Sequence, residues 1–149
     1  EDSLNYIAEN IYKPMGISNA LFEADADGTL VGSSYFYASA RDWARFGLLM
    51  LNEGEINDIQ IMDPEYVQKA ISPNTSNNEK AYGYQLWLNQ GDAQLRWNDL
   101  PGDSYAAMGN RQQRVMVIPS EDALIAFCNN SLFTIVLNTF SIPLGCFIE

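Results

Sequence analysis

The sequence predicts an α+β fold in which helices pack against an antiparallel sheet. Residues 39–54 have the apolar spacing of an amphipathic helix, and residues 104–128 contain three strand-like segments joined by short turns. Strands with such short connections can pair only as an antiparallel meander. The chain has 149 residues, of which 47% are hydrophobic, and this is enough apolar material for the core of one domain.

The helix expected between its cap Ser39 and Gly54 is the clearest element. Ser39 is a good N-cap, and Asp42 three residues later predicts a capping box with Asp in place of Glu. Gly54 is expected to end this helix, because glycine adopts the left-handed conformation of a helix terminus without steric cost. The expected buried face consists of Trp43, Phe46, Gly47, Met50 and Leu51.

Shorter elements precede this helix. A helix is expected from Ser3 to Tyr12, ended by Pro14, and a short strand is expected over residues 20–23. Residues 25–28, Asp-Ala-Asp-Gly, predict a turn. Because these aspartates lack the ligand pattern of a calcium loop, we expect no metal site there.

The second half of the sequence changes from helical to extended patterns. Residues 59–62 form a short apolar segment, after which Asp63 and Pro64 predict the start of a helix that runs to about Ile71. Residues 82–88 alternate with a period of two, which predicts a strand. Three more strands are expected over residues 104–109, 114–118 and 123–128, with turns at residues 110–113 and 119–122.

Several segments carry a family resemblance. Residues 40–47 read Ala-Arg-Asp-Trp-Ala-Arg-Phe-Gly and follow Gly32-Ser33-Ser34. A second matching segment, Pro14-Met15-Gly16-Ile17, precedes them in the order expected for the family. Further matching segments are Tyr-Gly-Tyr-Gln-Leu-Trp at residues 82–87 and residues 115–122. Together they resemble the serine β-lactamase-related hydrolases. This group includes class C β-lactamases, D-Ala-D-Ala carboxypeptidases, family VIII esterases and 6-aminohexanoate-dimer hydrolases.

The resemblance covers Leu4 to Ala126 and implies a partial β-lactamase/transpeptidase-like fold. Residues 1–126 would be the C-terminal portion of a hydrolase domain, and residues 127–149 an apolar tail that is uncharged up to Ile148. The chain begins with Glu1 rather than Met, which suggests further sequence upstream. The resemblance also implies a periplasmic or secreted location.

The resemblance further implies hydrolysis of an amide or ester bond through an acyl-enzyme, with a Ser-x-x-Lys nucleophile and a Tyr motif. No serine of this sequence has a lysine three positions later, and the Tyr motif should precede Ser3. We therefore expect no catalytic residue in this chain and no hydrolysis by these 149 residues alone. A non-catalytic binding domain of the same fold is the alternative.

Only the third motif of the family is represented. Gly109-Asn110-Arg111-Gln112-Gln113 aligns with the family's Gly-His-x-Gly-Gln, so Asn110 replaces His or Lys and Gln112 replaces Gly. The resemblance implies substrate binding by Gly109, Asn110 and Arg111, with Arg111 supplying a charge for a carboxylate. A hairpin turn with a solvated Arg explains these residues equally well. Ser33 and Ser34 are expected to border the same cleft.

Composition excludes several functions. The net charge of −11 argues against nucleic acid as a partner, because phosphates would be repelled. The absence of histidine excludes Ser-His-Asp catalysis and His-ligated zinc within this chain. We expect no cofactor and no metal, and a small-molecule amide or ester as the substrate of the complete protein. Cys128 and Cys146 do not indicate a redox compartment.

The end of the sequence is unusual, because no residue from Ala123 to Ile148 is charged. Its length would span a bilayer, so a membrane tether through the tail is one interpretation. Against this, several asparagines together with Pro143 and Gly145 are unfavourable in a membrane helix. A buried strand with a core-docked segment and a foreign tail, as from a shifted reading frame, are the other interpretations.

Overall fold

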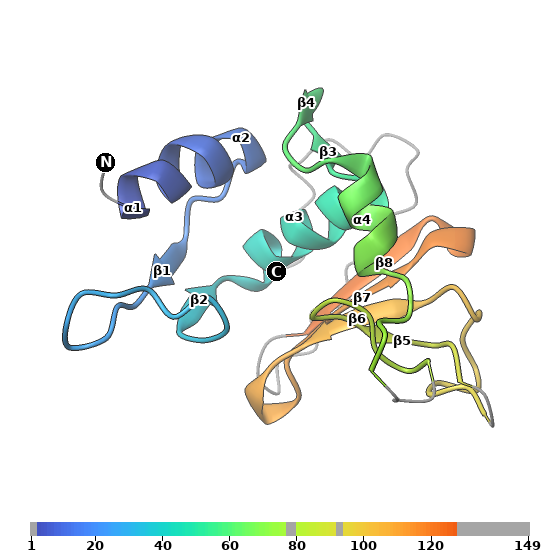
Figure 1. Ribbon diagram of the computed structural model, residues 1–149. Coiled ribbons are helices and arrows are strands. Elements are labelled where there is room, and N and C mark those ends of the chain that lie inside the picture. Colours follow the sequence, from blue (N-terminus) through green and yellow to red (C-terminus); the bar gives the residue numbers. More distant parts are fainter. Residues whose placement is uncertain (1–2, 77–79, 92–93, 128–149) are drawn as a thin grey trace, which may run out of the picture.

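The computed structural model describes residues 3–76, 80–91 and 94–127. Helices and antiparallel strands are mixed along the chain, which confirms the predicted α+β class (Figure 1). The elements are α1 (Ser3–Ile7), a π-helical turn (Ala8–Tyr12), α2 (Lys13–Met15), β1 (Ala20–Phe22), β2 (Phe36–Ala38), α3 (Ala40–Leu51), β3 (Glu55–Ile56), β4 (Ile59–Gln60), α4 (Pro64–Ala70), β5 (Trp87–Leu88), β6 (Tyr105–Met108), a 3-10 turn (Asn110–Gln112), β7 (Arg114–Ile118), a second 3-10 turn (Pro119–Glu121) and β8 (Ala123–Phe127).

The main sheet has the strand order β5-β6-β7-β8, and every neighbouring pair is antiparallel. In its register Tyr105 lies opposite Val117, and Val117 opposite Leu124. The expected meander is therefore confirmed. The tail interpretations concern residues 128–149, which lie outside the described residues, as do both cysteines.

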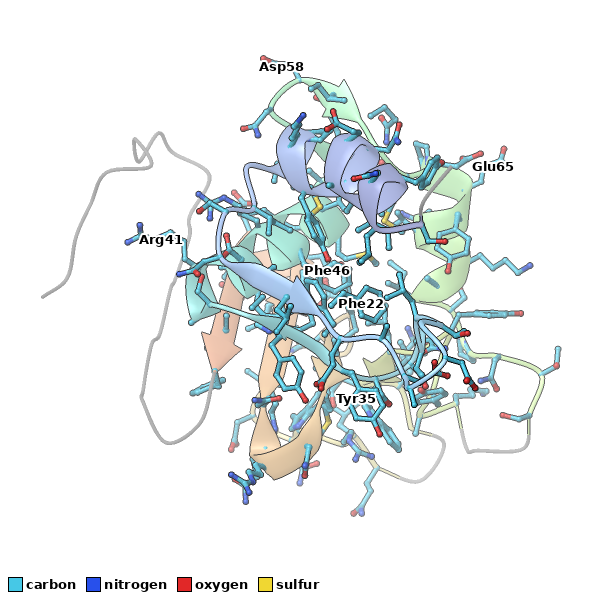
Figure 2. All side chains as sticks on the ribbon, turned by 90° about the vertical axis from the view of Figure 1, so that its left-hand side faces the viewer. Phe22, Tyr35, Arg41, Phe46, Asp58 and Glu65 are labelled. Atoms are coloured by element: carbon cyan, nitrogen blue, oxygen red, sulfur yellow. The ribbon has the colours of Figure 1, made fainter. Side chains whose placement is uncertain are left out.

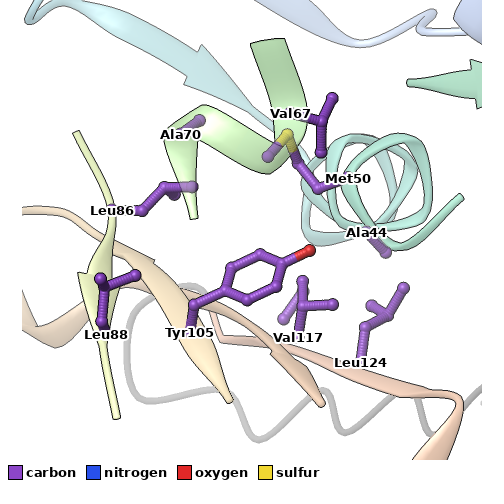
Figure 3. Close-up of a cluster of buried hydrophobic side chains, with 10 residues drawn as sticks. Ala44, Met50, Val67, Ala70, Leu86, Leu88, Tyr105, Val117 and Leu124 are labelled. Carbon is purple, nitrogen blue, oxygen red and sulfur yellow. The ribbon is translucent and has the colours of Figure 1, made fainter. Parts of the chain in front are cut away.

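The core lies between this sheet and the helices α3 and α4 (Figure 3). Gly47 lets α3 approach the sheet closely, because an added Cβ would lie 2.9 Å from Cγ1 of Val115 and 3.4 Å from Leu124. The predicted apolar face of α3 is confirmed in part. Gly47 and Met50 are buried, whereas Trp43, Phe46 and Leu51 are half-buried, and Ala44 and Leu49 are buried although they were not predicted to be. The buried cluster contains Ala44, Met50, Val67, Ala70, Leu86, Leu88, Tyr105, Val117, Leu124 and Ala126.

The start of α3 differs from a capping box in one bond. The hydroxyl of Ser39 accepts the N–H of Asp42 at 3.2 Å, as predicted. The backbone N–H of Ser39 does not bond to Asp42, however, because it donates to the carbonyl of Asn19 at 3.1 Å. The Asp42 carboxylate instead accepts the N–H of Asn19 at 3.2 Å. Tertiary contact with the segment before β1 has therefore replaced the local reciprocal bond.

The prediction that Pro14 ends the first helix is wrong. The helix continues to Met15 and ends at Gly16, which has a left-handed φ of 68°. The N–H groups of Gly16 and Ile17 donate to the carbonyls of Lys13 and Tyr12, which is the Schellman arrangement. Pro14 is tolerated because a π-helical turn precedes it and leaves it near the start of a new helical segment, where its missing N–H is not needed.

Residues 82–88 do not form one strand, as predicted, but fold back on themselves. Tyr82 forms an isolated bridge with Trp87, and the N–H of Gly83 donates to the carbonyl of Leu86 at 2.9 Å. Gln85, with a φ of 67°, makes the reversal. Gly83 lies against the end of α4, where an added Cβ would be 2.2 Å from the carbonyl oxygen of Ala70.

The N-terminal elements lie on the opposite side of α3 from β5 (Figure 1). The strands β1 and β2 form a hairpin whose inner face packs through edge-to-face rings: Phe22 with Phe36 at 5.7 Å and Phe36 with Trp43 at 5.1 Å between centroids. Within residues 3–76, 80–91 and 94–127, none of the helices has the length and apolar character of a membrane span.

Candidate functional site

The turn between β6 and β7 holds three of the predicted site residues. The N–H of Gly109 donates to the carbonyl of Gln113 at 2.9 Å, and the N–H of Gln113 returns to the carbonyl of Asn110 at 3.3 Å. Arg111 has φ 54° and ψ 37°, and Gln112 has φ 65°. Two successive left-handed residues match the twist of a two-residue hairpin. The turn is therefore a tight reversal of the chain direction.

This backbone is strained, because neither left-handed residue is glycine. A non-glycine residue in this region is disfavoured by roughly 1 kcal/mol. The side chain of Asn110 offsets part of this cost, since its Oδ1 accepts the N–H of Arg111 at 2.8 Å. Strain of this kind is common at ligand-binding positions.

Arg111 carries the charge of the turn. Its side chain is exposed, and within the part of the chain that the structure describes it forms no ion pair. Lys69, Arg96 and Arg114 likewise form no ion pair within that part of the chain, so the lack of an acidic partner does not by itself distinguish Arg111. Its guanidinium can bind a carboxylate through two parallel hydrogen bonds.

An open strand edge adjoins the turn. Strand β5 pairs only with Tyr105 and Ala106 of β6, so on the side away from β7 no described strand covers Ala107 and Met108. An uncovered strand edge offers backbone N–H and C=O groups to an extended ligand. The uncovered edge at Ala107 and Met108 therefore directly precedes the turn that carries Arg111.

Arg114 is a residue that the sequence did not single out. It is the first residue of β7, opposite Met108, and its Nε is buried without a hydrogen-bond acceptor among the described residues. A buried donor without an acceptor is costly unless a further group supplies one. No pattern in the sequence pointed to this buried donor, because Arg at a strand end is ordinarily solvated.

Ser33 and Ser34 lie in the loop that leads into β2. Both are exposed, their hydroxyl oxygens are 3.5 Å apart, and the N–H of Ser34 donates to the carbonyl of Val31. In Figure 1 this loop and the β6–β7 turn both lie below the level of α3. No hydrogen bond within the described ranges joins the two serines to Gly109, Asn110 or Arg111, so their place in one site stays a prediction.

Two hollows lie elsewhere. One of ≈330 Å³ is lined by the β1–β2 hairpin, and one of ≈260 Å³ is lined by residues that include Gln90, Gln94 and Arg96. The Arg96 guanidinium stacks on Trp87, 4.0 Å from the ring centroid. None of the five predicted site residues lines either hollow. Among residues 3–76, 80–91 and 94–127, no group of three acidic or cysteine side chains can hold a metal ion.

Comparison with known proteins finds similar solved structures and a similar sequence. No family model matches the sequence. A protein assigned as a 6-aminohexanoate-dimer hydrolase of Bacillus anthracis superposes with a TM-score of 0.58 at 23% identity, over 76% of this chain and 29% of that one. A protein assigned as a β-lactamase of Bacteroides dorei superposes with a TM-score of 0.59 at 15% identity, over 82% of this chain and 42% of that one.

The chain has the fold of the serine β-lactamase-related proteins. The resemblance drawn from residues 14–17, 32–34, 40–47, 82–87 and 115–122 is thereby confirmed at the level of the fold. An uncharacterized protein of Alkalihalophilus pseudofirmus is 30% identical over 132 residues, which is 84% of this chain and 38% of the relative. The chain thus spans less than half the length of each of these proteins.

Proposed function

We infer that this chain is the C-terminal portion of a β-lactamase-related serine hydrolase that cleaves amide or ester bonds. The observation that carries the proposal is the β-lactamase-related fold combined with the free Arg111 on a strained turn beside an open strand edge. The division at residue 126, with a separate tail after it, belongs to the same proposal. So does a periplasmic or secreted location.

The reaction needs a nucleophile from outside these 149 residues, since the sequence contains no Ser-x-x-Lys. A serine hydroxyl attacks the substrate carbonyl, and a lysine takes the hydroxyl proton. The leaving amine or alcohol departs with a proton, and water then releases the acid and restores the serine. The residues of this chain bind and orient: Arg111 holds a carboxylate, and the edge at Ala107 and Met108 holds the amide or ester backbone.

The test compares the complete gene product with the 149-residue chain on a neutral nitrophenyl ester and a chromogenic β-lactam that carries a carboxylate. We expect hydrolysis by the complete protein and none by the short chain. Arg111→Ala in the complete protein should raise KM for the carboxylate substrate about tenfold, by loss of a charge-assisted hydrogen bond. KM for the neutral ester should not change.

Lys69→Ala is the matched control, because Lys69 is an exposed cation at the far end of α4. It should leave both substrates unaffected. Hydrolysis by the 149-residue chain, lost on replacing one of its serines, would contradict the proposal that the nucleophile lies outside these residues. Equal loss of activity on both substrates in Arg111→Ala would contradict carboxylate binding.

A non-catalytic binding domain is the second candidate. The uncharged Asn110 and the strained Gln112 favour it, because they stand where the family pattern Gly-His-x-Gly-Gln has His and Gly. This candidate predicts that the complete protein fails to react with a fluorophosphonate probe yet still binds a carboxylate ligand through Arg111.

A further inference from the structure

Arg96, in the loop between β5 and β6, lies against two tryptophan rings. Its guanidinium carbon is 4.0 Å from the ring centroid of Trp87 and 5.9 Å from that of Trp97. Trp87 in turn meets the ring of Tyr82 edge-to-face, at 4.8 Å between centroids. A guanidinium that stacks on an aromatic ring keeps its N–H donors in its own plane, where they can bind a further group.

The two rings that hold Arg96 are themselves fixed by the fold. Trp87 belongs to β5 and lies opposite Ala106 in the sheet. Trp97 is held by Asn89, whose buried amide accepts the N–H of Trp97 at 2.7 Å and donates to its carbonyl at 3.0 Å. Arg96 is therefore more ordered than a surface arginine on a free loop, and a binding group that is ordered in advance loses less entropy when a ligand arrives.

A hollow of ≈260 Å³ opens beside Arg96. The side chains of Gln90 and Gln94 add amide groups to its lining, and Leu88 and Leu95 add apolar surface. Pockets that enclose drug-sized ligands have about 300 Å³ or more, so this hollow suits a smaller molecule. Its lining thus combines one cation, two amides and an apolar wall.

The hollow is separate from the candidate site at the β6–β7 turn. Leu88 at the end of β5 lies opposite Tyr105, the first residue of β6, whereas the turn with Arg111 follows Met108, the last residue of β6. The loop after β5 and the β6–β7 turn therefore lie at opposite ends of β6 (Figure 1).

The N-terminal elements leave this side of the molecule open. Figure 2 looks from the left-hand side of Figure 1, so Phe22 and Tyr35 are in front and the loop after β5 lies behind them. Among the described residues, none before Ala81 lines the hollow. A ligand can therefore reach Arg96 without displacing the β1–β2 hairpin.

We propose that the hollow beside Arg96 binds a small carboxylate that also carries an amide group, such as an N-acyl amino acid. Arg96 binds the carboxylate through two parallel hydrogen bonds. Gln90 and Gln94 bind the amide group of the ligand, because each side-chain amide both donates and accepts. Leu88 and Leu95 contact its apolar part. This binding is additional to the proposed hydrolysis and does not depend on it.

Calorimetric titration of the complete gene product with N-acetylglycine tests the site. Arg111→Ala serves as the starting protein, so that binding of carboxylate at the β6–β7 turn does not contribute. We expect binding of N-acetylglycine and none of N-acetylglycinamide, which lacks the carboxylate. Arg96→Gln should weaken binding roughly tenfold or more, and Arg96→Lys should recover only part of the loss, since lysine lacks the planar fork.

Lys69→Gln is the matched control. Lys69 is also an exposed cation over an aromatic ring, 5.2 Å from the centroid of Tyr84, but it does not line the hollow. Its replacement should leave the affinity for N-acetylglycine unchanged. No binding at tens of millimolar, equal binding of the two probes, or an unchanged affinity in Arg96→Gln would overturn the proposal.

Nuclear magnetic resonance locates the ligand without any substitution at Arg96. The sequence contains three tryptophans, so each indole N–H gives one signal. N-acetylglycine should shift the signals of Trp87 and Trp97 and the side-chain amide signals of Gln90 and Gln94, whereas Trp43 in α3 should not respond. A response of Trp43 alone would place the ligand elsewhere and refute the site. Ester hydrolysis, measured separately, tests the proposed function without reference to Arg96.

Discussion

Asp42 and Arg45 form an ion pair of 2.8 Å within α3, and the Asp42 side chain is only 2% exposed. The same carboxylate accepts the hydroxyl of Ser39 at 2.7 Å and the N–H of Asn19 at 3.2 Å. Asp42 is therefore the link between α3 and the segment that leads into the β1–β2 hairpin. A buried charge with this set of partners is far more sensitive to substitution than an exposed helix cap.

Asp42→Ala should lower the free energy of unfolding by about 3 kcal/mol, because it leaves Arg45 and two backbone donors without a partner. Asp63→Ala is the matched control. Asp63 also caps a helix, accepting the N–H of Glu65 at 2.9 Å, but it is exposed. Its loss should cost about 1 kcal/mol. Urea unfolding measures both, and equal costs would contradict the role of Asp42.

Gln112→Gly should stabilise the chain by about 1 kcal/mol, since glycine adopts the φ of 65° without strain. Gln113→Gly is the control one residue away. Gln113 has φ −60°, so glycine gains nothing there and adds unfolded-state entropy. Thermal unfolding should give opposite shifts in Tm, and a loss of stability in Gln112→Gly would contradict the strain.

Gly83→Ala should destabilise the chain by about 2 kcal/mol or more, because its Cβ would lie 2.2 Å from the backbone oxygen of Ala70 and backbone cannot yield easily. Gly102→Ala is the control, as nothing lies within 4 Å of its added Cβ. Circular dichroism during thermal unfolding distinguishes them. Similar behaviour of the two variants would show that α4 and residue 83 are not in close contact.

The buried side chain of Asn89 holds the loop before β6 in place through hydrogen bonds. It is 0% exposed, and its amide nitrogen donates to the carbonyls of Trp97, Leu100 and Pro101 at 2.9–3.0 Å. Asn89→Asp replaces this donor with an oxygen that faces three acceptors, so it should cost about 3 kcal/mol or more. Gln90→Glu is the control, because it changes the charge in the same loop without altering the hydrogen bonds of Asn89. Amide hydrogen exchange at Trp97 should rise in Asn89→Asp only.

Burial raises the pKa of the Tyr105 phenol, and the nearby Asp103 raises it further. In the unfolded chain a tyrosine ionises near pH 10. Tyr105 therefore contributes stability that is present below about pH 10 and is lost as the pH rises from there towards the folded-state pKa. Tyr105→Phe should flatten the alkaline fall in Tm, whereas Tyr66→Phe should not. An unchanged alkaline slope in Tyr105→Phe would contradict this assignment.

Local patterns were sufficient where neighbouring residues make the bonds themselves. The Asp63-Pro64 start of α4 and the short turns of the β6-β7-β8 meander form as predicted, because caps and tight turns are satisfied within a few residues. Patterns failed where a distant segment supplied the decisive contact. Residues 82–88 alternate like a strand, yet the end of α4 accepts the N–H of Tyr84 and bends them back.

The candidate site shows the same division. Periodicity and turn chemistry are local, and they were enough to predict the fold class, a helix after Ser39 and the turn at residues 110–113. The helix ends at Leu51 rather than at Gly54, however. The three-dimensional arrangement was needed to establish that Arg111 and Gln112 are left-handed and that Asp42 binds the segment before β1. It was also needed to find that Arg114 has a buried donor with no acceptor among the described residues. These features depend on which segments meet in space, and burial and backbone strain are set by that meeting rather than by any single stretch of sequence.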